Sequence, residues 1–176
     1  MPHAIEPATS ARATCRGCNQ KIAKGELRFG ERQPNAFGEG EMTLWFHLTC
    51  AAYKRPEAFL EVARLSADPA VTSLIPAADA GIAHRRLPRV NGAERAPTGR
   101  ARCRSCRELI DAGVWRIALT FFEEFRFAPS GFVHAACAPA YFETAEILDR
   151  VAHFSPNLDR AELEDLRRAL RATRAA

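Results

Sequence analysis

Four short segments of this chain have a pattern of hydrophobic and polar residues that is typical of β-strands. In each half of the chain, two such segments follow one another and are separated by a loop. The predicted strands are 26–32 and 43–47 in the first half, and 114–121 and 131–134 in the second. Each half is therefore predicted to form a short antiparallel sheet.

Helical spacing of apolar residues follows the second strand of each half. Helices are predicted over 48–65 and 136–154. Pro56 interrupts the first of them, because proline lacks the N–H that a helix interior requires. A closing helix is expected over 158–172, where leucines share one face, and 76–84 is its shorter counterpart.

The two halves repeat one sequence pattern. The pattern reads TSARATCRGCNQKIAKGELRF at 9–29 and PTGRARCRSCRELIDAGVWRI at 97–117, an offset of 88 residues. Further along each half the offset is 87 residues, so a one-residue gap falls in a loop, where length changes are tolerated. Such a repeat indicates one structural unit used twice. The predicted fold class is α+β, with two homologous small modules, each a short antiparallel sheet with packed helices.

The segment between the modules has the composition of a linker. Residues 85–99 (RRLPRVNGAERAPTG) contain two prolines, two glycines and few apolar side chains. Module 1 is accordingly predicted over 1–84 and module 2 over 100–176.

All six cysteines fall into two clusters of matching spacing. Each cluster reads Cys-x-x-Cys, a spacer of 28 or 27 residues, then His-x-x-Cys. Three soft thiolates and one imidazole form a tetrahedral ligand set for Zn²⁺, and four protein ligands leave no position for a reacting water. We therefore predict two structural zinc ions, one in each module. The ligands are Cys15, Cys18, His47 and Cys50 in module 1, and Cys103, Cys106, His134 and Cys137 in module 2.

Two other interpretations of the cysteines are buried free thiols and disulfides. Chance burial does not explain the matched spacing of all six residues. The N-terminal residues show no basic region followed by an apolar core, as a secretory signal would, and disulfides are rare in proteins that are not exported. We expect a cytoplasmic protein with reduced thiols. No apolar run approaches the length of a membrane span, so no membrane partner is expected.

Charge is small overall and uneven along the chain. The formal net charge is +4, too little by itself to argue for a polyanionic partner. Residues 85–107 contain eight arginines and one acid, whereas 143–165 contain seven acids and two arginines. Any DNA affinity would therefore come from local arginine placement. Arginine also outnumbers lysine 22 to 3, which is typical of a GC-rich bacterial genome.

The residues around the ligands add a family resemblance. Module 1 carries Arg-Ala-Thr-Cys at 12–15, KIAKGELR at 21–28, and Trp-Phe-His at 45–47. Together with the ligand spacing, this pattern resembles the zinc fingers of poly(ADP-ribose) polymerases and of a eukaryotic DNA ligase. The resemblance occurs once in each module, although module 2 has Phe-Val-His at 132–134 in place of Trp-Phe-His.

The resemblance implies recognition of DNA strand breaks, that is nicks, gaps and ends, without regard to sequence. The 176 residues leave no room for a catalytic domain such as those polymerases and ligases carry. We therefore expect a non-enzymatic, nucleoid-associated DNA-binding protein that senses DNA damage. A DNA repair protein is an expected partner, and both a monomer and a DNA-induced dimer are compatible with the sequence.

Four arginines are the phosphate-contacting residues that the resemblance implies. Arg12 and Arg28 flank the first ligand pair of module 1, and Arg100 and Arg116 occupy the same positions in module 2. Zinc would hold them rigidly toward DNA phosphates. The alternative is that they are ordinary solvated arginines, which their recurrence at both positions argues against.

Apolar side chains in the loop before each ligand histidine are the implied base-stacking residues. A broken strand exposes the face of a terminal base pair, which an apolar side chain can cover. The candidates are Phe37 and Met42 in module 1, and Phe125 and Phe127 in module 2. An alternative for Phe37 is a core position over the zinc site. Alternation places Phe121, Phe125 and Phe127 on one face if their segment is extended.

Other classes of function stay open on the sequence alone. Glu123 and Glu124 would repel phosphate, so module 2 is also compatible with docking onto module 1. A zinc-stapled protein-interaction adaptor or transcriptional co-regulator would use the aromatic loop of module 2 and the acidic stretch 143–165 as partner surfaces. A metallo-nuclease is the third class, but the sequence shows no open zinc site, paired carboxylate motif or activated nucleophile.

Overall fold

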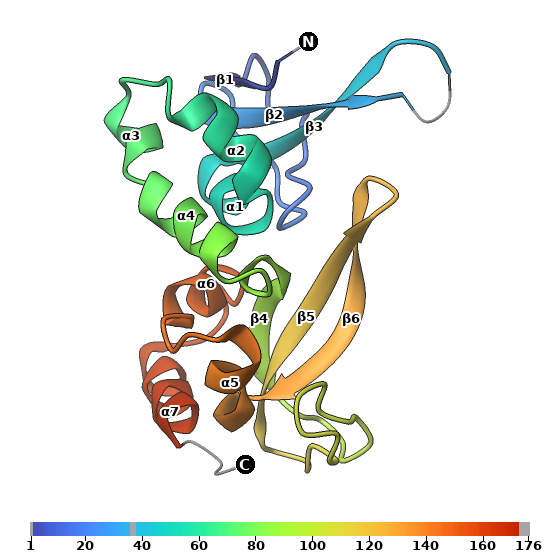
Figure 1. Ribbon diagram of the computed structural model, residues 1–176, viewed down its shortest axis with the longest axis vertical. Coiled ribbons are helices and arrows are strands. Elements are labelled where there is room, and N and C mark those ends of the chain that lie inside the picture. Colours follow the sequence, from blue (N-terminus) through green and yellow to red (C-terminus); the bar gives the residue numbers. More distant parts are fainter. Residues whose placement is uncertain (1, 36–37, 173–176) are drawn as a thin grey trace. The chain divides into compact units, whose positions relative to one another are not determined.

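The computed structural model describes residues 2–35 and 38–172. The chain divides into two compact units, Met1–Ala83 and His84–Ala176, and each contains a three-stranded sheet with helices (Figure 1). The pairing within both sheets is antiparallel, so the α+β class is as predicted. No helix in the described part of the chain is long and apolar enough to cross a bilayer.

The sheet of unit 1 contains both predicted strands and one that was not predicted. Its strands, in spatial order, are β1 (Ala4–Pro7), β2 (Leu27–Pro34) and β3 (Glu41–His47). Phe29 on β2 lies opposite Phe46 on β3. Phe29 also meets Phe59 edge-on, with ring centroids 5.8 Å apart, and all three rings are fully buried. These aromatic side chains form the centre of the unit 1 core.

The helices of unit 1 follow β3 directly. They are α1 (Leu48–Lys54), α2 (Pro56–Ala63), α3 (Pro69–Thr72) and α4 (Ile75–Ala83). The interruption predicted at Pro56 is present, because this residue begins α2, where its missing N–H costs nothing. Both α1 and α2 pack against α4.

The sheet of unit 2 has the same topology. Its strands, in spatial order, are β4 (Val90–Arg95), β5 (Trp115–Glu123) and β6 (Arg126–His134). Ile117 on β5 pairs with Val133 on β6, and both are fully buried. The hairpin of β5 and β6 is the longest feature of this sheet (Figure 1).

The single helix predicted over 136–154 was wrong. The chain there forms a 3-10 turn and two short helices: η2 (Ala135–Cys137), α5 (Ala138–Phe142) and α6 (Leu148–His153). Glu143 has a φ of 60°, a left-handed conformation that ends α5. The closing helix α7 (Arg160–Arg171) is as predicted, and the side chains of Asp159 and Glu162 cap its start reciprocally.

The segment 85–99 is not a linker. It contains a 3-10 turn, η1 (Leu87–Arg89), and β4, which pairs with β5 and takes the place in this sheet that β1 takes in unit 1. Gly92 was one of the two glycines that suggested a linker, yet its φ is +97° and a Cβ there would lie 2.6 Å from the carbonyl oxygen of Phe154. The glycine therefore allows close packing of β4, which composition alone does not distinguish from a linker.

The tip of the β5–β6 hairpin corrects the predicted aromatic face of unit 2. Glu124 and Phe125 form a two-residue turn with φ values of 47° and 63°, so Phe125 does not lie on a strand. Phe122 lies opposite Phe127 across the hairpin, with ring centroids 4.8 Å apart. Because neighbouring residues of a strand face opposite sides, Phe121 and Phe127 do not share a face.

Candidate metal centres and nucleic-acid interface

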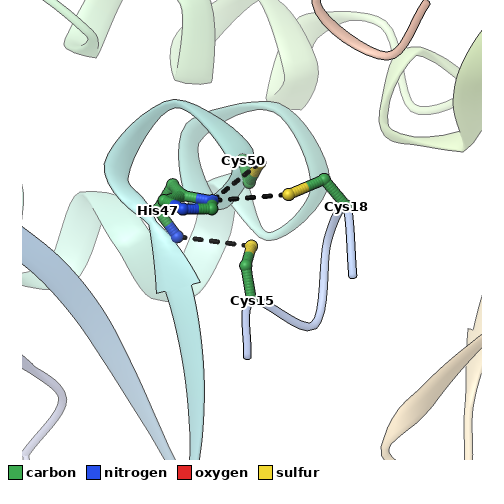
Figure 2. Close-up of side chains that lie close together, drawn as sticks. All are labelled: Cys15, Cys18, His47 and Cys50. Atoms are coloured by element: carbon green, nitrogen blue, oxygen red, sulfur yellow. Dashed lines mark hydrogen bonds between the residues drawn. The ribbon is translucent and has the colours of Figure 1, made fainter. Parts of the chain in front are cut away.

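The four predicted ligands of unit 1 converge on one point (Figure 2). Cys15 and Cys18 lie on a turn that we call the knuckle, with its counterpart at 103–106 in unit 2. His47 ends β3, and Cys50 lies in the first turn of α1. The four ligand atoms all lie within 4.8 Å of one another.

The distances in this cluster fit a zinc ion. His47 Nδ1 is 3.3 Å from Cys18 Sγ and 3.9 Å from Cys50 Sγ. Tetrahedral zinc, with bonds of about 2.0 Å to nitrogen and 2.3 Å to sulfur, would separate such atoms by roughly 3.6 Å. The backbone N–H of His47 also donates to Cys15 Sγ at 3.3 Å, as a thiolate accepts (Figure 2).

Unit 2 repeats this geometry. The ligand atoms of Cys103, Cys106, His134 and Cys137 also lie within 4.8 Å of one another. His134 Nδ1 is 3.5 Å from Cys106 Sγ and 3.8 Å from Cys137 Sγ. His134 ends β6 as His47 ends β3, so corresponding strands position both imidazoles.

A backbone carbonyl holds the second ring nitrogen of each histidine. His47 Nε2 donates to the carbonyl of Lys21 at 3.3 Å, and His134 Nε2 donates to that of Leu109 at 3.2 Å. Lys21 and Leu109 occupy equivalent positions in the repeat. A proton on Nε2 leaves the lone pair on Nδ1, so both histidines are in the tautomer that binds a metal through Nδ1.

Two thiols of unit 1, Cys15 and Cys50, have pKa values shifted in opposite directions. Hydrogen bonds involving Cys18 and Cys50 lower the pKa of Cys15 to about 3, against the opposing effect of burial. The same contacts with Cys15 and Cys18, and burial after them, raise the pKa of Cys50 far above its ordinary value. A divalent cation at the centre would stabilise all three thiolates together.

Two thiols of unit 2, Cys103 and Cys137, have pKa values shifted in the same two directions. Burial opposes ionisation of Cys103, but the backbone N–H groups of Cys106, His134 and Ser105 lower its pKa. Burial and then the charge of Cys103 raise the pKa of Cys137 to about 12. The donor atoms of both clusters suit a thiophilic cation, and the three-sulfur, one-nitrogen set is that of structural zinc. With four protein ligands each, the two zinc sites are closed to substrate and serve the fold.

Comparison with known families identifies the first of these modules. Residues 6–75 match the family described as the poly(ADP-ribose) polymerase and DNA-ligase Zn-finger region. Residues 6–75 are a PARP-type zinc finger. This finger begins in β1, contains all four ligands of unit 1 and ends at the start of α4. The resemblance in the ligand spacing and its flanking residues is thereby confirmed.

Individual relatives extend the likeness beyond this PARP-type finger. The poly(ADP-ribose) polymerase of Sarcophaga peregrina is 32% identical over 142 residues, which cover 70% of this chain and 14% of that protein. The Drosophila melanogaster polymerase is 27% identical over 139 residues, with the same shares. Poly(ADP-ribose) polymerase 1 of Caenorhabditis elegans is 42% identical over 50 residues, 28% of this chain and 5% of that protein.

The lengths of these matches limit what can be inferred from the relatives. A match to 70% of the chain is longer than either unit, so the likeness to the fly polymerases reaches into both. At the same time the chain spans 14% or less of the length of these three relatives. The likeness is thus to a small part of these proteins, and it says nothing about the reaction of the whole enzymes.

The structure separates the four predicted phosphate-contacting arginines into two kinds. Arg12 and Arg100 are exposed beside their knuckles. Arg28 and Arg116 are only 7% and 6% exposed. As folded, the first pair presents its charge to solvent and the second does not.

Arg28 is held between a carboxylate and an aromatic ring. Its guanidinium carbon lies 3.5 Å from the ring centroid of Trp45. Its terminal nitrogen donates to Glu6 Oε1 at 2.7 Å, which joins β2 to β1. This arrangement neutralises the arginine and ties the edge strand to the sheet.

Unit 2 contains the same arrangement. Arg116 stacks on Phe132 at 3.6 Å, and Glu94 accepts a hydrogen bond from its Nε at 3.0 Å. Sequence reasoning missed both carboxylates, Glu6 because no strand was predicted there and Glu94 because it lay in the supposed linker. The 88-residue offset relates these two glutamates and was the signal that could have found them.

Three of the four stacking candidates lie in the described residues, on the hairpin of each unit. Met42 is half-buried on β3, close to the loop from β2. Phe37 lies outside the described residues. Phe125 is half-buried in the two-residue turn, and Phe127 is half-buried against Phe122. Among the described residues, the hairpin of unit 1 thus carries one stacking candidate and that of unit 2 carries two.

Part of the acidic stretch 143–165 is used inside unit 2. Asp165 accepts hydrogen bonds from Arg95, from Trp115 Nε1 at 2.8 Å and from Arg168 at 3.0 Å. The bond from Trp115, followed by that from Arg168, lowers the pKa of this carboxyl. These internal contacts account for one of the acids that an adaptor protein would have offered to a partner.

Proposed function

We propose that this chain is a DNA-binding protein that recognises strand breaks independently of sequence and catalyses no reaction on them. The supporting observation is the PARP-type finger over 6–75, whose four ligands converge beside an exposed arginine. Unit 2 carries the same ligand cluster on the same sheet topology. Two such modules in one chain are suited to contact DNA on both sides of a nick or gap.

Arg12 is suited to contact phosphate. Lys21 Nζ donates to the carbonyl of Arg12 and to Thr14 Oγ1, both at 3.1 Å, so the backbone of Arg12 is tied to the knuckle. Its side chain is exposed. A guanidinium held in this way adds affinity for the DNA backbone at any sequence.

Selectivity for breaks would come from the hairpin of unit 1. An intact duplex hides the faces of its base pairs, whereas a nick or end exposes one. Stacking of an apolar side chain on that face is worth about 1–3 kcal/mol. Met42 and Phe37 are the side chains that we assign to this contact.

The cellular role follows from the same properties. Since the zinc sites are closed, we infer that the protein marks or protects a break and brings a DNA repair protein to it. We place this activity at the nucleoid in the cytoplasm, with the protein acting as a monomer or as a dimer formed on DNA.

Anisotropy competition tests the proposal. The full chain, loaded with zinc, is bound to a labelled nicked duplex and challenged with nicked, gapped, blunt and hairpin-capped intact duplexes. We expect each broken DNA to compete at concentrations about tenfold or more below the capped duplex. The salt dependence should correspond to roughly three to six phosphate contacts. Equal competition by capped duplex would overturn break recognition, and lack of any DNA binding would favour an adaptor.

Arg12→Ala is expected to weaken binding to nicked DNA several-fold and to lower the salt slope by about one, because one phosphate contact is lost. Zinc content should stay at two ions. Arg64→Ala is the matched control, since this exposed arginine pairs with Asp79 away from the knuckle. Unchanged affinity in the Arg12 variant would remove this residue from the interface.

Met42→Ala combined with Phe37→Ala is expected to reduce the preference for nicked over capped duplex by about tenfold, since apolar stacking on the exposed base pair is lost. Affinity for capped duplex should change little, because phosphate contacts are retained. Measuring both affinities separates the two effects. A parallel loss on both DNAs would mean that these residues support the fold or general binding and do not read the break.

A further inference from the structure

An arginine-lined pocket lies beside the knuckle of unit 2. Its volume is about 550 Å³. It is lined by three arginines, Arg102, Arg104 and Arg107, and by Ala101, Gly131, Phe132, Tyr141 and the zinc ligand Cys103. Among the described residues that line it, none is acidic, and none of the three arginines forms an ion pair with a described carboxylate.

Arg104 is positioned by a bulge in β6. Its Nε donates to the carbonyl of Ser130 at 3.1 Å, which leaves its two terminal nitrogens for a ligand. The register of β5 and β6 shifts at this point. Gly131 has a φ of +107°, and a Cβ there would lie 2.7 Å from Arg104 Nε. The glycine therefore makes room for the arginine side chain against the strand.

Arg107 occupies a backbone conformation that arginine rarely adopts. Its φ is 69°, and the equivalent residue of unit 1, Asn19, has a φ of 60°. Asparagine tolerates this left-handed region, whereas arginine is strained there. Arg102, which donates to the carbonyl of Arg107 at 3.3 Å, replaces Thr14 of unit 1. Unit 2 thus adds two arginines to a knuckle that folds without them in unit 1.

Two further arginines approach Tyr141 from η1 and the residue before it. Arg86 donates to the carbonyl of Tyr141 at 2.9 Å, and its guanidinium lies 4.9 Å from the ring centroid. Arg89 donates to the Tyr141 hydroxyl at 3.4 Å. Five arginines of the run 85–107, part of which was predicted to be a linker, therefore line this pocket or contact Tyr141 in its wall.

We propose that this pocket of unit 2 binds a phosphate group of DNA. Guanidinium groups match the oxygens of phosphate in charge and in hydrogen-bond geometry, and three of them converge here without a competing carboxylate. The inference rests on the proposed function for the source of the phosphate. That source is either an internal phosphodiester or the terminal phosphate at a break, and the same pocket chemistry serves both.

Because the two units are equivalent, unit 1 shows which substitutions in the unit 2 knuckle should still allow folding. Arg102→Thr with Arg107→Asn gives unit 2 the residues that stand at these positions in unit 1. The thermal stability should be equal or higher, because asparagine relieves the strain at position 107, and zinc content should stay at two ions. Arg160→Gln with Arg167→Gln removes the same charge from exposed positions of α7 and is the matched control.

The decisive readout is the salt dependence of binding to nicked DNA. The pocket variant should bind about tenfold more weakly at 0.1 M salt and lose about one from the salt slope, because the pocket holds one phosphate. The control variant should retain the wild-type slope. Equal slopes for the wild type and the pocket variant would overturn the inference while leaving break recognition intact.

Two further arms identify the phosphate and separate this inference from the proposed function. Nicked duplexes with a 5′-phosphate or a 5′-hydroxyl are compared. If the variant loses affinity only for the nick with a 5′-phosphate, the pocket binds a terminal phosphate. If it loses affinity equally for both nicks, the pocket binds an internal phosphodiester. Inorganic triphosphate is titrated calorimetrically into both proteins in the absence of DNA. Weaker binding of triphosphate by the variant supports phosphate binding in the pocket, even if the wild type does not prefer broken DNA. Equal binding of triphosphate by both proteins counts against the pocket.

Discussion

Replacing Cys50 with alanine is expected to lower the zinc content of the protein from two ions to one and to unfold unit 1. Cys50 is fully buried, and its sulfur belongs to the cluster around His47 Nδ1. Zinc ligation contributes about 10–16 kcal/mol in zinc-finger peptides, as much as the whole net stability of ordinary domains, about 5–15 kcal/mol. His47→Ala should have the same result. Zinc released by acid and counted with a chromogenic chelator measures the stoichiometry.

The two tryptophans allow each unit to be followed separately. Trp45 lies on β3 of unit 1 and Trp115 on β5 of unit 2. In Cys50→Ala, the emission of Trp45 should become that of a solvated indole, while Trp115 should stay native. His84→Ala is the control, because this histidine belongs to neither cluster. Two bound zinc ions and native Trp45 emission in Cys50→Ala would show that the ligand assignment is wrong.

Replacing Arg55 with alanine is expected to destabilise unit 1 by about 3 kcal/mol. Glu31 is 1% exposed, and its carboxylate accepts hydrogen bonds from Arg55 Nε at 2.8 Å and from a terminal nitrogen at 2.6 Å. Gln33 also donates to Glu31 at 2.6 Å but carries no charge. Removal of Arg55 would leave a buried, uncompensated carboxylate. Breaking a buried ion pair by removing one partner costs about 3–5 kcal/mol of stability. We expect the lower end of this range because the Arg55 side chain is 24% exposed.

The equivalent residues of unit 2 show how the stability lost in Arg55→Ala can be recovered. The residues at the equivalent positions are Leu119 and Phe142, which are 3% and 1% exposed. Glu31→Leu combined with Arg55→Phe is therefore expected to recover most of the stability, since a well-packed apolar pair often equals a buried ion pair. Denaturant unfolding with zinc present measures all three proteins. A double variant as unstable as Arg55→Ala would show that the attraction within the ion pair stabilises the unit.

The sequence was sufficient for the zinc clusters and for the central hairpin of each unit. Ligand types and spacing are local properties, and the repeat provided each assignment twice. The strands around Phe29 and Ile117 were also predicted, although burial there does not alternate: residues 28–31 and 115–117 are all buried. Pro56 marked a helix boundary because its chemical restriction is independent of the rest of the fold.

The edge strands and the buried arginines could not be predicted in the same way. β1 and β4 are short and lie at the edge of each sheet, where few apolar residues are needed, so their periodicity is weak. Arg28 was taken for a surface cation because its partners Glu6 and Trp45 are distant in sequence. Burial of a charge depends on such partners, which only the tertiary structure brings together. The break after α5 depends on one left-handed residue, Glu143, for which glycine is the usual sequence signal.

The most direct test of break recognition compares two plasmids that differ by one covalent bond. Covalently closed relaxed circles and singly nicked circles of identical sequence have no ends, so a nick is the only lesion present. The zinc-loaded full chain is mixed with equal amounts of both at physiological salt, and the DNA retained with the protein is separated by electrophoresis. We expect the nicked circle to be retained preferentially, by about tenfold, and the preference to disappear when zinc is chelated. Equal retention of the two circles by the zinc-loaded protein would contradict recognition of strand breaks.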